Sequence, residues 1–114
     1  MEYEGEYLYD KKWNGKGYDE NGNITYELKN GTGNVKEYHD NGKLFFEGEY
    51  LNGKRNGKGK EYYDNGKLEF EGEYLYDQKR KGKLYINNKL EYDGEYLYYK
   101  KWNGKGYNEN LNII

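Results

Sequence analysis

Apolar and charged residues alternate along several stretches of the chain with a period of two. In residues 67–74 the apolar or small positions are Leu68, Phe70, Gly72 and Tyr74, and the positions between them carry Lys or Glu. This alternation is typical of a β-strand with one buried face, and no helical period of 3.6 competes with it. We therefore predict a strand with rings on one face and charges on the other.

The same frame recurs through the chain. Its clearest copy occupies residues 46–66, and it begins again at Tyr3, Tyr26, Phe70 and Tyr92. Self-similarity at a fixed period indicates a repeated supersecondary unit. We predict one repeat domain over residues 1–114, with repeats at approximately 3–25, 26–45, 46–69, 70–91 and 92–114, the last of them truncated.

Each repeat is predicted to contain two strands and two turns. The turn sequence Asp64-Asn65-Gly66 returns at residues 40–42 and, with Glu in place of Asp, at 20–22, and Asn-Gly supplies the positive φ angles of a tight hairpin. A longer turn is expected between Tyr50 and Gly57. The fold class is therefore all-β, an elongated single-layer antiparallel β-meander of hairpin repeats. About ten strands at ~4.8 Å each would span roughly 45–50 Å.

The composition limits how such a sheet can be stabilised. Hydrophobic residues make up 33% of the chain and aromatic residues 19%, so more than half of the apolar material is aromatic. An aliphatic core of ordinary thickness cannot be built from it. We expect Tyr and Phe rings to lie across glycines of the neighbouring strand, where the missing Cβ leaves room. Replacing Gly72 by Val should therefore be among the most damaging substitutions.

The repeated frame closely resembles the MORN repeat. Residues 61–68 also resemble the variant of that repeat in bacterial proteins of toxin–antitoxin type. The resemblance implies an elongated, twisted array of β-hairpins with scaffolding roles, dimerisation through terminal repeats in several members, and a proposed association with phosphoinositides or membranes. The family has no shared catalytic residues, and this chain departs from its pattern at Leu28 and Leu84. The residues that carry the resemblance are Phe46-Glu47-Gly48-Glu49-Tyr50, Asn52-Gly53-Lys54-Arg55-Asn56-Gly57-Lys58-Gly59, Tyr62 and Asp64-Asn65-Gly66.

Nothing in the sequence favours catalysis. His39 is the only histidine, and the chain has neither Cys nor Ser to act with it. Pairs of carboxylates recur in every well-formed copy, so the fold places them and a unique acid–base pair is not indicated. Asp64-Asn65-Gly66 lacks the spaced acidic ligands of a calcium loop. We predict that the protein is not an enzyme, with no catalytic residues, no cofactor and no metal site.

Charge is distributed unevenly between the two kinds of turn. In a meander these turns fall on opposite edges, which predicts a basic edge and an acidic edge in a chain of net charge −2. Solubility explains this pattern, and contact with an anionic lipid surface is the functional alternative. Nucleic acid is not an expected partner. The basic positions are Lys11-Lys12, Lys54-Arg55, Lys79-Arg80-Lys81 and Lys100-Lys101, and the acidic ones are Asp19-Glu20, Asp40, Asp64 and Glu109.

The two ends of the chain are near-copies of each other. Residues 5–24 and 94–113 are identical at 17 of 20 positions, and only these copies contain Trp. Exposed sheet ends invite strand pairing, so terminal hairpins that match could join chains into a dimer or a longer assembly. The candidate binding residues are Trp13, Tyr18, Trp102, Tyr107, Lys54, Arg55, Lys79 and Arg80.

The favoured interpretation is a non-enzymatic scaffold or protein–protein interaction module, acting on a protein partner or on itself through its terminal repeats. Three alternatives stay open: an anionic-lipid binding module, a glycan-binding module and an immunity protein of antitoxin type. The N-terminal residues form no signal peptide, and no stretch approaches the ~18 apolar residues of a membrane span. We therefore expect a soluble, cytoplasmic protein.

Overall fold

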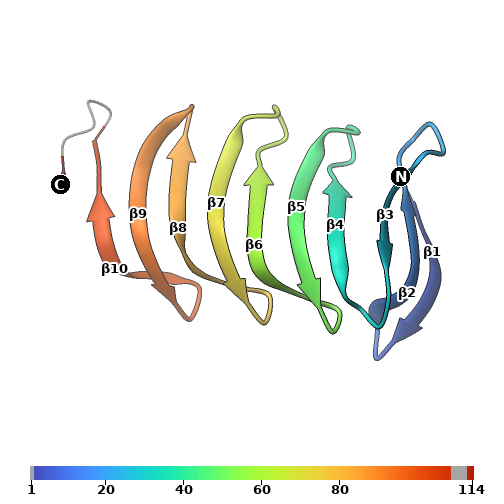
Figure 1. The fold of residues 1–114 in the computed structure, drawn as a ribbon. Coiled ribbons are helices and arrows are strands. Elements are labelled where there is room, and N and C mark those ends of the chain that lie inside the picture. Colours follow the sequence, from blue (N-terminus) through green and yellow to red (C-terminus); the bar gives the residue numbers. More distant parts are fainter. Residues whose placement is uncertain (1, 109–112) are drawn as a thin grey trace.

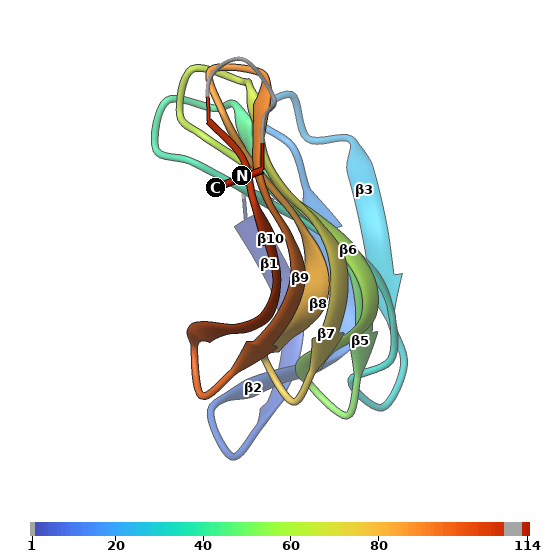
Figure 2. The same ribbon diagram turned by 90° about the vertical axis from the view of Figure 1, so that its left-hand side faces the viewer.

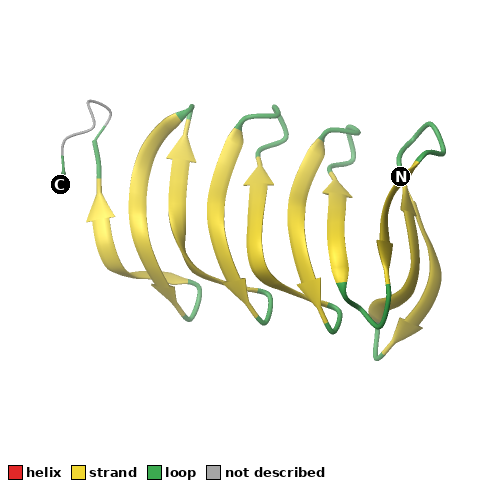
Figure 3. Ribbon diagram, viewed as in Figure 1, coloured by secondary structure: helices red, strands yellow, loops and turns green. Residues whose placement is uncertain are grey.

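A computed structural model describes residues 2–108 and 113–114, and within that part of the chain all regular structure is β-strand (Figures 1 and 3). Ten strands follow one another along the ribbon. Each pairs antiparallel with its neighbours in sequence order, except β3 with β4, and this confirms the predicted all-β meander. The strands are β1 (Glu2–Leu8), β2 (Lys11–Tyr18), β3 (Ile24–Leu28), β4 (Gly33–Tyr38), β5 (Leu44–Leu51), β6 (Lys54–Tyr62), β7 (Leu68–Leu75), β8 (Gln78–Ile86), β9 (Lys89–Leu97) and β10 (Lys100–Gly106).

The molecule is long and thin. Its principal extents are 46 × 27 × 16 Å, so the length agrees with the prediction and the thickness corresponds to one layer of sheet with its side chains. The strands curve strongly when seen along the ribbon axis (Figure 2). The backbone ladder is not continuous, however, because β1–β3 form one sheet and β4–β10 form another.

A row of glycines crosses the larger sheet in register. Gly72, for example, pairs with Gly59 on one side and with Gly82 on the other. A Cβ at Gly72 would lie 2.2 Å from the Lys81 carbonyl oxygen and 2.8 Å from the Phe70 ring. Neighbouring strands thus approach at distances that no side chain would permit, with a ring lying across the contact, as predicted. The full row is Gly48, Gly59, Gly72, Gly82, Gly94 and Gly104.

The core is a file of aromatic rings above this glycine row. Phe46 and Phe70 are completely buried. Tyr74 stands edge-on between them, with its ring centroid 5.5 Å from that of Phe46 and 5.6 Å from that of Phe70. The file continues through Tyr96 to Tyr92, again with edge-to-face contacts. We call this side of the sheet the ring face.

The interruption between β3 and β4 follows from two large side chains in the glycine row. Leu28 and Val35 occupy the positions that glycines hold in the third repeat, and each is almost fully buried. They cannot approach as closely as a pair of glycines, so the two strands share only the single bridge between Lys29 and Thr32. Tyr26, Leu28 and Val35 form a small core of their own at this seam.

The two kinds of turn differ from the prediction. The stretch expected as a long turn between Tyr50 and Gly57 is mostly strand, because β6 begins at Lys54 and only Asn52 and Gly53 form the turn. Both residues have positive φ, as a type I′ turn requires. In the Asp-Asn-Gly connections only the glycine has positive φ, for example Gly66 at 88°, so these are longer loops rather than two-residue hairpins. Glu109, assigned to the acidic edge, lies outside the described residues.

Replacing Gly72 by Val should lower the free energy of unfolding by about 3 kcal/mol or more, because the new side chain displaces both a ring and the backbone of β8. Urea denaturation measures this. Gly106 provides the control, because its Cβ would meet nothing closer than a side-chain carbon of Ile114 at 3.4 Å. A Gly106→Ala protein should stay within about 1 kcal/mol of wild type. Equal losses in the two variants would contradict the close-approach explanation.

Candidate functional site: the hairpin edge

Basic residues next to the tight turns fold over the ring face. The Arg55 guanidinium carbon lies 4.0 Å from the centre of the Phe46 ring, and the Lys79 ammonium lies 4.6 Å from that of Phe70. Lys12 and Lys101 take the same position over Tyr3 and Tyr92, at 5.3 Å in both cases. In each of these four hairpins one cation therefore covers the aromatic ring that lies over the glycine row.

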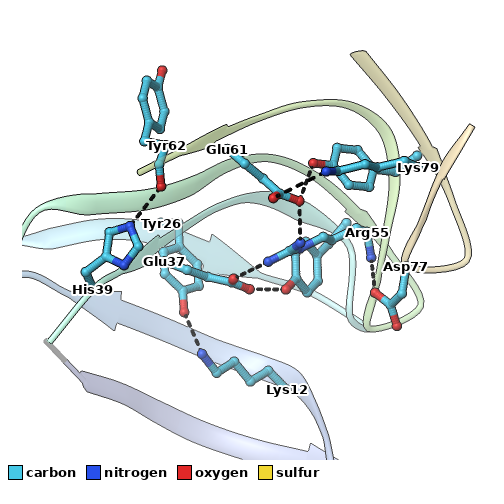
Figure 4. A network of polar contacts seen from close by, with 11 residues as sticks. Lys12, Tyr26, Glu37, His39, Arg55, Glu61, Tyr62, Asp77 and Lys79 are labelled. Carbon is cyan, nitrogen blue, oxygen red and sulfur yellow. Dashed lines mark hydrogen bonds and ion pairs between the residues drawn. The ribbon is translucent and has the colours of Figure 1, made fainter. Parts of the chain in front are cut away.

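Arg55 is the centre of a polar network on this face (Figure 4). Its guanidinium binds Glu37 at 2.8 Å and Glu61 at 3.1 Å, and its side chain is only 17% exposed. The Tyr74 hydroxyl donates a hydrogen bond to Glu61 at 2.6 Å, and the Tyr50 hydroxyl donates to Glu37. One buried and one half-buried carboxylate, one cation and two phenols are thus mutually satisfied, and the network ties β4, β5, β6 and β7 together.

The titration of these groups follows from their burial. Burial and the neighbouring carboxylates Glu61 and Glu37 raise the pKa of Tyr74 and of Tyr50 well above its usual range. Burial opposes the charge of Arg55, but Glu37, Tyr50 and Glu61 together outweigh it and raise the pKa of the guanidinium. At the seam, burial raises the pKa of Tyr26 to about 12, and the charge of Glu37 contributes to the same shift to a smaller extent. The phenols are therefore hydrogen-bond donors at neutral pH.

This arrangement divides the predicted basic edge. Arg55 and Lys79 point over the rings, and Lys79 also lies 3.9 Å from Glu61, so their charge is largely engaged within the molecule. Arg80 is exposed. Lys54 is half-buried and lies over the ring of Tyr76 at 5.7 Å. Of the four predicted basic contact residues, Arg80 is exposed and the other three are half-buried.

Large exposed side chains gather along the edge formed by the tight turns. We call this the hairpin edge; it runs along the bottom of Figure 1, where β1 meets β2, β5 meets β6, β7 meets β8 and β9 meets β10. Tyr9 is 89% exposed, Tyr76 64%, and Tyr98 and Tyr99 75% each. The other exposed apolar side chains on this edge are Tyr7, Leu8, Leu51, Leu75, Leu97 and Trp102. Concentrations of exposed apolar residues on one side of a protein mark interaction surfaces.

The backbone at this edge is strained by the residues that occupy it. Tyr9, Tyr76 and Tyr98 have φ between 49° and 51°, and Tyr99 has φ of 67°. Asn52 and Gly53 adopt the same turn in the third repeat without that cost, since Asn and Gly tolerate left-handed conformations. A bulky residue in this region costs of order 1 kcal/mol or more. Tyrosine at these positions is therefore disfavoured by the fold.

The two near-identical terminal hairpins present different surfaces. Trp13 is half-buried, with its ring against Gly31 in the next turn, and its carbonyl accepts a hydrogen bond from the Gly31 amide at 2.8 Å. Trp102 occupies the equivalent position in the last hairpin and is 69% exposed. The tryptophan of the first hairpin is thus covered by the following repeat, and the equivalent tryptophan of the last hairpin is exposed.

The remaining candidate residues lie away from the hairpin edge. Tyr18 is half-buried and borders a cleft of about 330 Å³ at the seam between the two sheets, together with Lys12 and His39. The Nε2 of His39 donates to the Tyr62 carbonyl at 2.8 Å, which gives this histidine a structural role. Tyr107 is half-buried, and its amide donates to the Glu91 carbonyl. The structure does not bring Tyr18 and Tyr107 together with the Trp or basic candidates into one site.

The described residues contain neither a cluster of metal-ligating side chains nor a membrane-spanning helix. No group of three or more His, Cys, Asp or Glu side chains in residues 2–108 and 113–114 is arranged to hold a metal ion. No helix in that same part of the chain is long and apolar enough to cross a membrane.

Two family models match the central part of the chain. Residues 46–67 match the MORN repeat, and residues 32–52 match the MORN repeat variant. The chain is a MORN repeat protein. The variant match includes residues 37–44, which carry the same Glu-Tyr-x-Asp-Asn-Gly-Lys-Leu motif as residues 61–68. No curated protein and no solved structure matches the chain significantly.

MORN repeats occur in scaffold-type proteins and are generally non-catalytic modules. In this MORN protein the recurring features of the frame build the sheet: its glycines form the row and its rings form the core. The exposed tyrosines of the hairpin edge belong neither to that row nor to that core. The sequence pattern did not single out Tyr9, Tyr76, Tyr98 and Tyr99. The sequence feature that could have identified them is a tyrosine at turn positions where the clearest repeat has Asn-Gly.

Replacing Arg55 by Met should lower the free energy of unfolding by about 3 kcal/mol, because it leaves the half-buried Glu37 without its cation and the buried Glu61 with only Lys79 at 3.9 Å. The control is Arg80→Met, since Arg80 is exposed and should change stability by less than about 0.5 kcal/mol. Chemical denaturation of both variants measures the difference. An Arg55→Met protein as stable as wild type would show that the network contributes nothing.

Proposed function

We propose that this MORN protein is a non-enzymatic interaction module that holds a protein partner against its hairpin edge. One observation carries the proposal: the largest exposed side chains lie along this edge, several of them at turn positions where they cost backbone energy. Strain at exposed, ordered positions is a feature of functional surfaces. Tyrosine suits this role because it offers a large apolar ring with a polar tip and loses little conformational entropy on binding.

The rest of the fold supports a scaffold rather than a catalyst. Hydrogen bonds link successive turns, as between the Gly53 amide and the Gly31 carbonyl at 2.9 Å and the Asp77 amide and the Arg55 carbonyl at 2.9 Å. These bonds fix the spacing of the turns along the ribbon. A partner therefore meets a row of rings at defined intervals, and it can be a different protein or a second copy that uses the exposed Trp102.

An anionic membrane surface is the second candidate. Lys11 and Lys100 flank the exposed tyrosines of the first and last hairpins, and Lys54 lies over the Tyr76 ring. Tyr, Trp and Lys together are typical of side chains at a lipid headgroup boundary. Each Lys near such a surface adds about 1 kcal/mol. Stacking of a glycan on the same exposed rings would use the same edge.

We expect that the exposed tyrosines of the hairpin edge can be replaced without loss of stability. A variant with Tyr9→Asn, Tyr76→Asn, Tyr98→Asn and Tyr99→Gly gives these turns the residues that type I′ geometry favours. We expect each replacement to hold or raise the free energy of unfolding, by roughly 0.5 kcal/mol. The same variant should lose partner binding. Thermal melting measures the first effect, and quantitative capture from a lysate of the source cells together with sedimentation velocity measures the second.

The controls separate the candidates. Vesicles of phosphatidylserine and phosphatidylcholine, compared with phosphatidylcholine alone, test the lipid alternative with the same two proteins. Flotation of wild type with the anionic vesicles only, lost in a Lys11→Glu, Lys54→Glu, Lys100→Glu variant, would replace the protein-partner proposal by the lipid one. Capture of the same proteins by wild type and by the edge variant, with unchanged sedimentation, would overturn the role of the hairpin edge.

A further inference from the structure

A second surface of the molecule lies on the face opposite the rings. A hollow of about 530 Å³ runs over the backbones of Gly48, Gly59 and Gly72. A second hollow, of about 270 Å³, continues it over Gly72, Gly82 and Gly94. The two share Gly72 and its neighbours, so they form one groove along the glycine row, perpendicular to the strands. We call it the glycine groove.

The walls of the glycine groove carry charge that changes sign from strand to strand. Each glycine stands between two residues of like charge, and these point to the face opposite the rings because side chains alternate along a strand. Acidic pairs lie on β5, β7 and β9, and basic pairs lie on β6 and β8. The pairs are Glu47 and Glu49, Lys58 and Lys60, Glu71 and Glu73, Lys81 and Lys83, and Asp93 and Glu95.

Few of these charges are tightly paired with one another. Lys60 lies 3.5 Å from Glu71, and Lys81 lies 3.2 Å from Glu73, but all four side chains are more than 40% exposed. Exposed ion pairs of this kind contribute little to stability. Three carboxylates differ, because they accept hydrogen bonds within the molecule: Glu47 from the Tyr62 hydroxyl, Glu49 from the Lys58 amide and Glu95 from the Asn103 side-chain amide. The other carboxylates and ammonium groups are available to a partner at little cost.

We propose that the glycine groove binds an extended basic peptide in the polyproline II conformation. Acidic strands recur every second strand, at about 9.6 Å, since neighbouring strands lie ~4.8 Å apart. A polyproline II helix rises about 3.1 Å per residue, so every third residue returns after about 9.3 Å. Lysines at every third position therefore meet β5, β7 and β9 in turn.

The basic strands complement the backbone of the same peptide. A polyproline II helix has no internal hydrogen bonds, so its carbonyl groups are open to donors. The ammonium groups of Lys58, Lys60, Lys81 and Lys83 stand between the acidic pairs and donate to those carbonyls. The glycine backbones and the methylene stems of the wall residues form an apolar floor. Side-chain charge and backbone polarity of the peptide thus both find partners.

The test is calorimetric titration, at low and at moderate salt, of the whole chain with a peptide of four Lys-Pro-Pro units. An isomer with four Lys followed by eight Pro has the same composition and charge but the wrong spacing. We expect the spaced peptide to bind at least about tenfold more tightly, because only its lysines meet three acidic strands together. Equal affinity for both isomers, or no binding of the spaced peptide, would overturn the proposal.

A matched pair of variants locates the site. Glu71→Gln with Glu73→Gln neutralises the strand shared by both halves of the groove, and it should weaken binding of the spaced peptide about tenfold. Glu4→Gln with Glu6→Gln changes the same Glu-Gly-Glu motif in β1, which does not border the groove, and should leave affinity unchanged. Equal weakening by both variants would show that peptide affinity depends only on the net charge of the protein, and it would contradict the assigned site.

Discussion

The close approach of glycine to glycine across neighbouring strands is the constraint on which the rest of the structure depends. Where Gly72 meets Gly59 and Gly82, the backbones leave no space for a Cβ. That absence gives the rings of Phe46 and Phe70 a place to lie, so a single layer of sheet can bury aromatic side chains completely. The rings in turn provide the platform for Arg55 and Lys79, whose charges the carboxylates of Glu37 and Glu61 balance.

Period-two alternation and the recurring glycines were sufficient to predict the strands, their antiparallel order and the position of rings over glycines. The boundary at Lys54 was missed because Lys and Asn have low strand propensity, and the strand conformation of Lys54 and Arg55 comes from pairing with β5. The two-sheet division was missed for a related reason. Leu28 and Val35 are good strand residues locally, and only their meeting across the turn prevents the ladder from closing.

The candidate sites were less predictable than the fold. Arg55 and Arg80 look alike in a sequence, but a bulge in each hairpin and the position of Glu37 in a different repeat direct one inward and leave the other exposed. The tyrosines of the hairpin edge looked like ordinary members of the aromatic frame. Their exposure follows from the tightness of the turns, which leaves residues such as Tyr9 and Tyr98 no neighbour to cover them.

The seam between β3 and β4 has a mechanical consequence. On either side of it, successive strands are held by several backbone hydrogen bonds, which set their separation and resist bending. Across it, contact depends on the Lys29–Thr32 bridge, the turn contacts and the apolar packing of Tyr26, Leu28 and Val35, which have no strict directional requirement. The ribbon therefore has one compliant joint between two stiffer segments. Two partners held on opposite sides of that joint could change their mutual angle while every ladder hydrogen bond in both sheets stays intact.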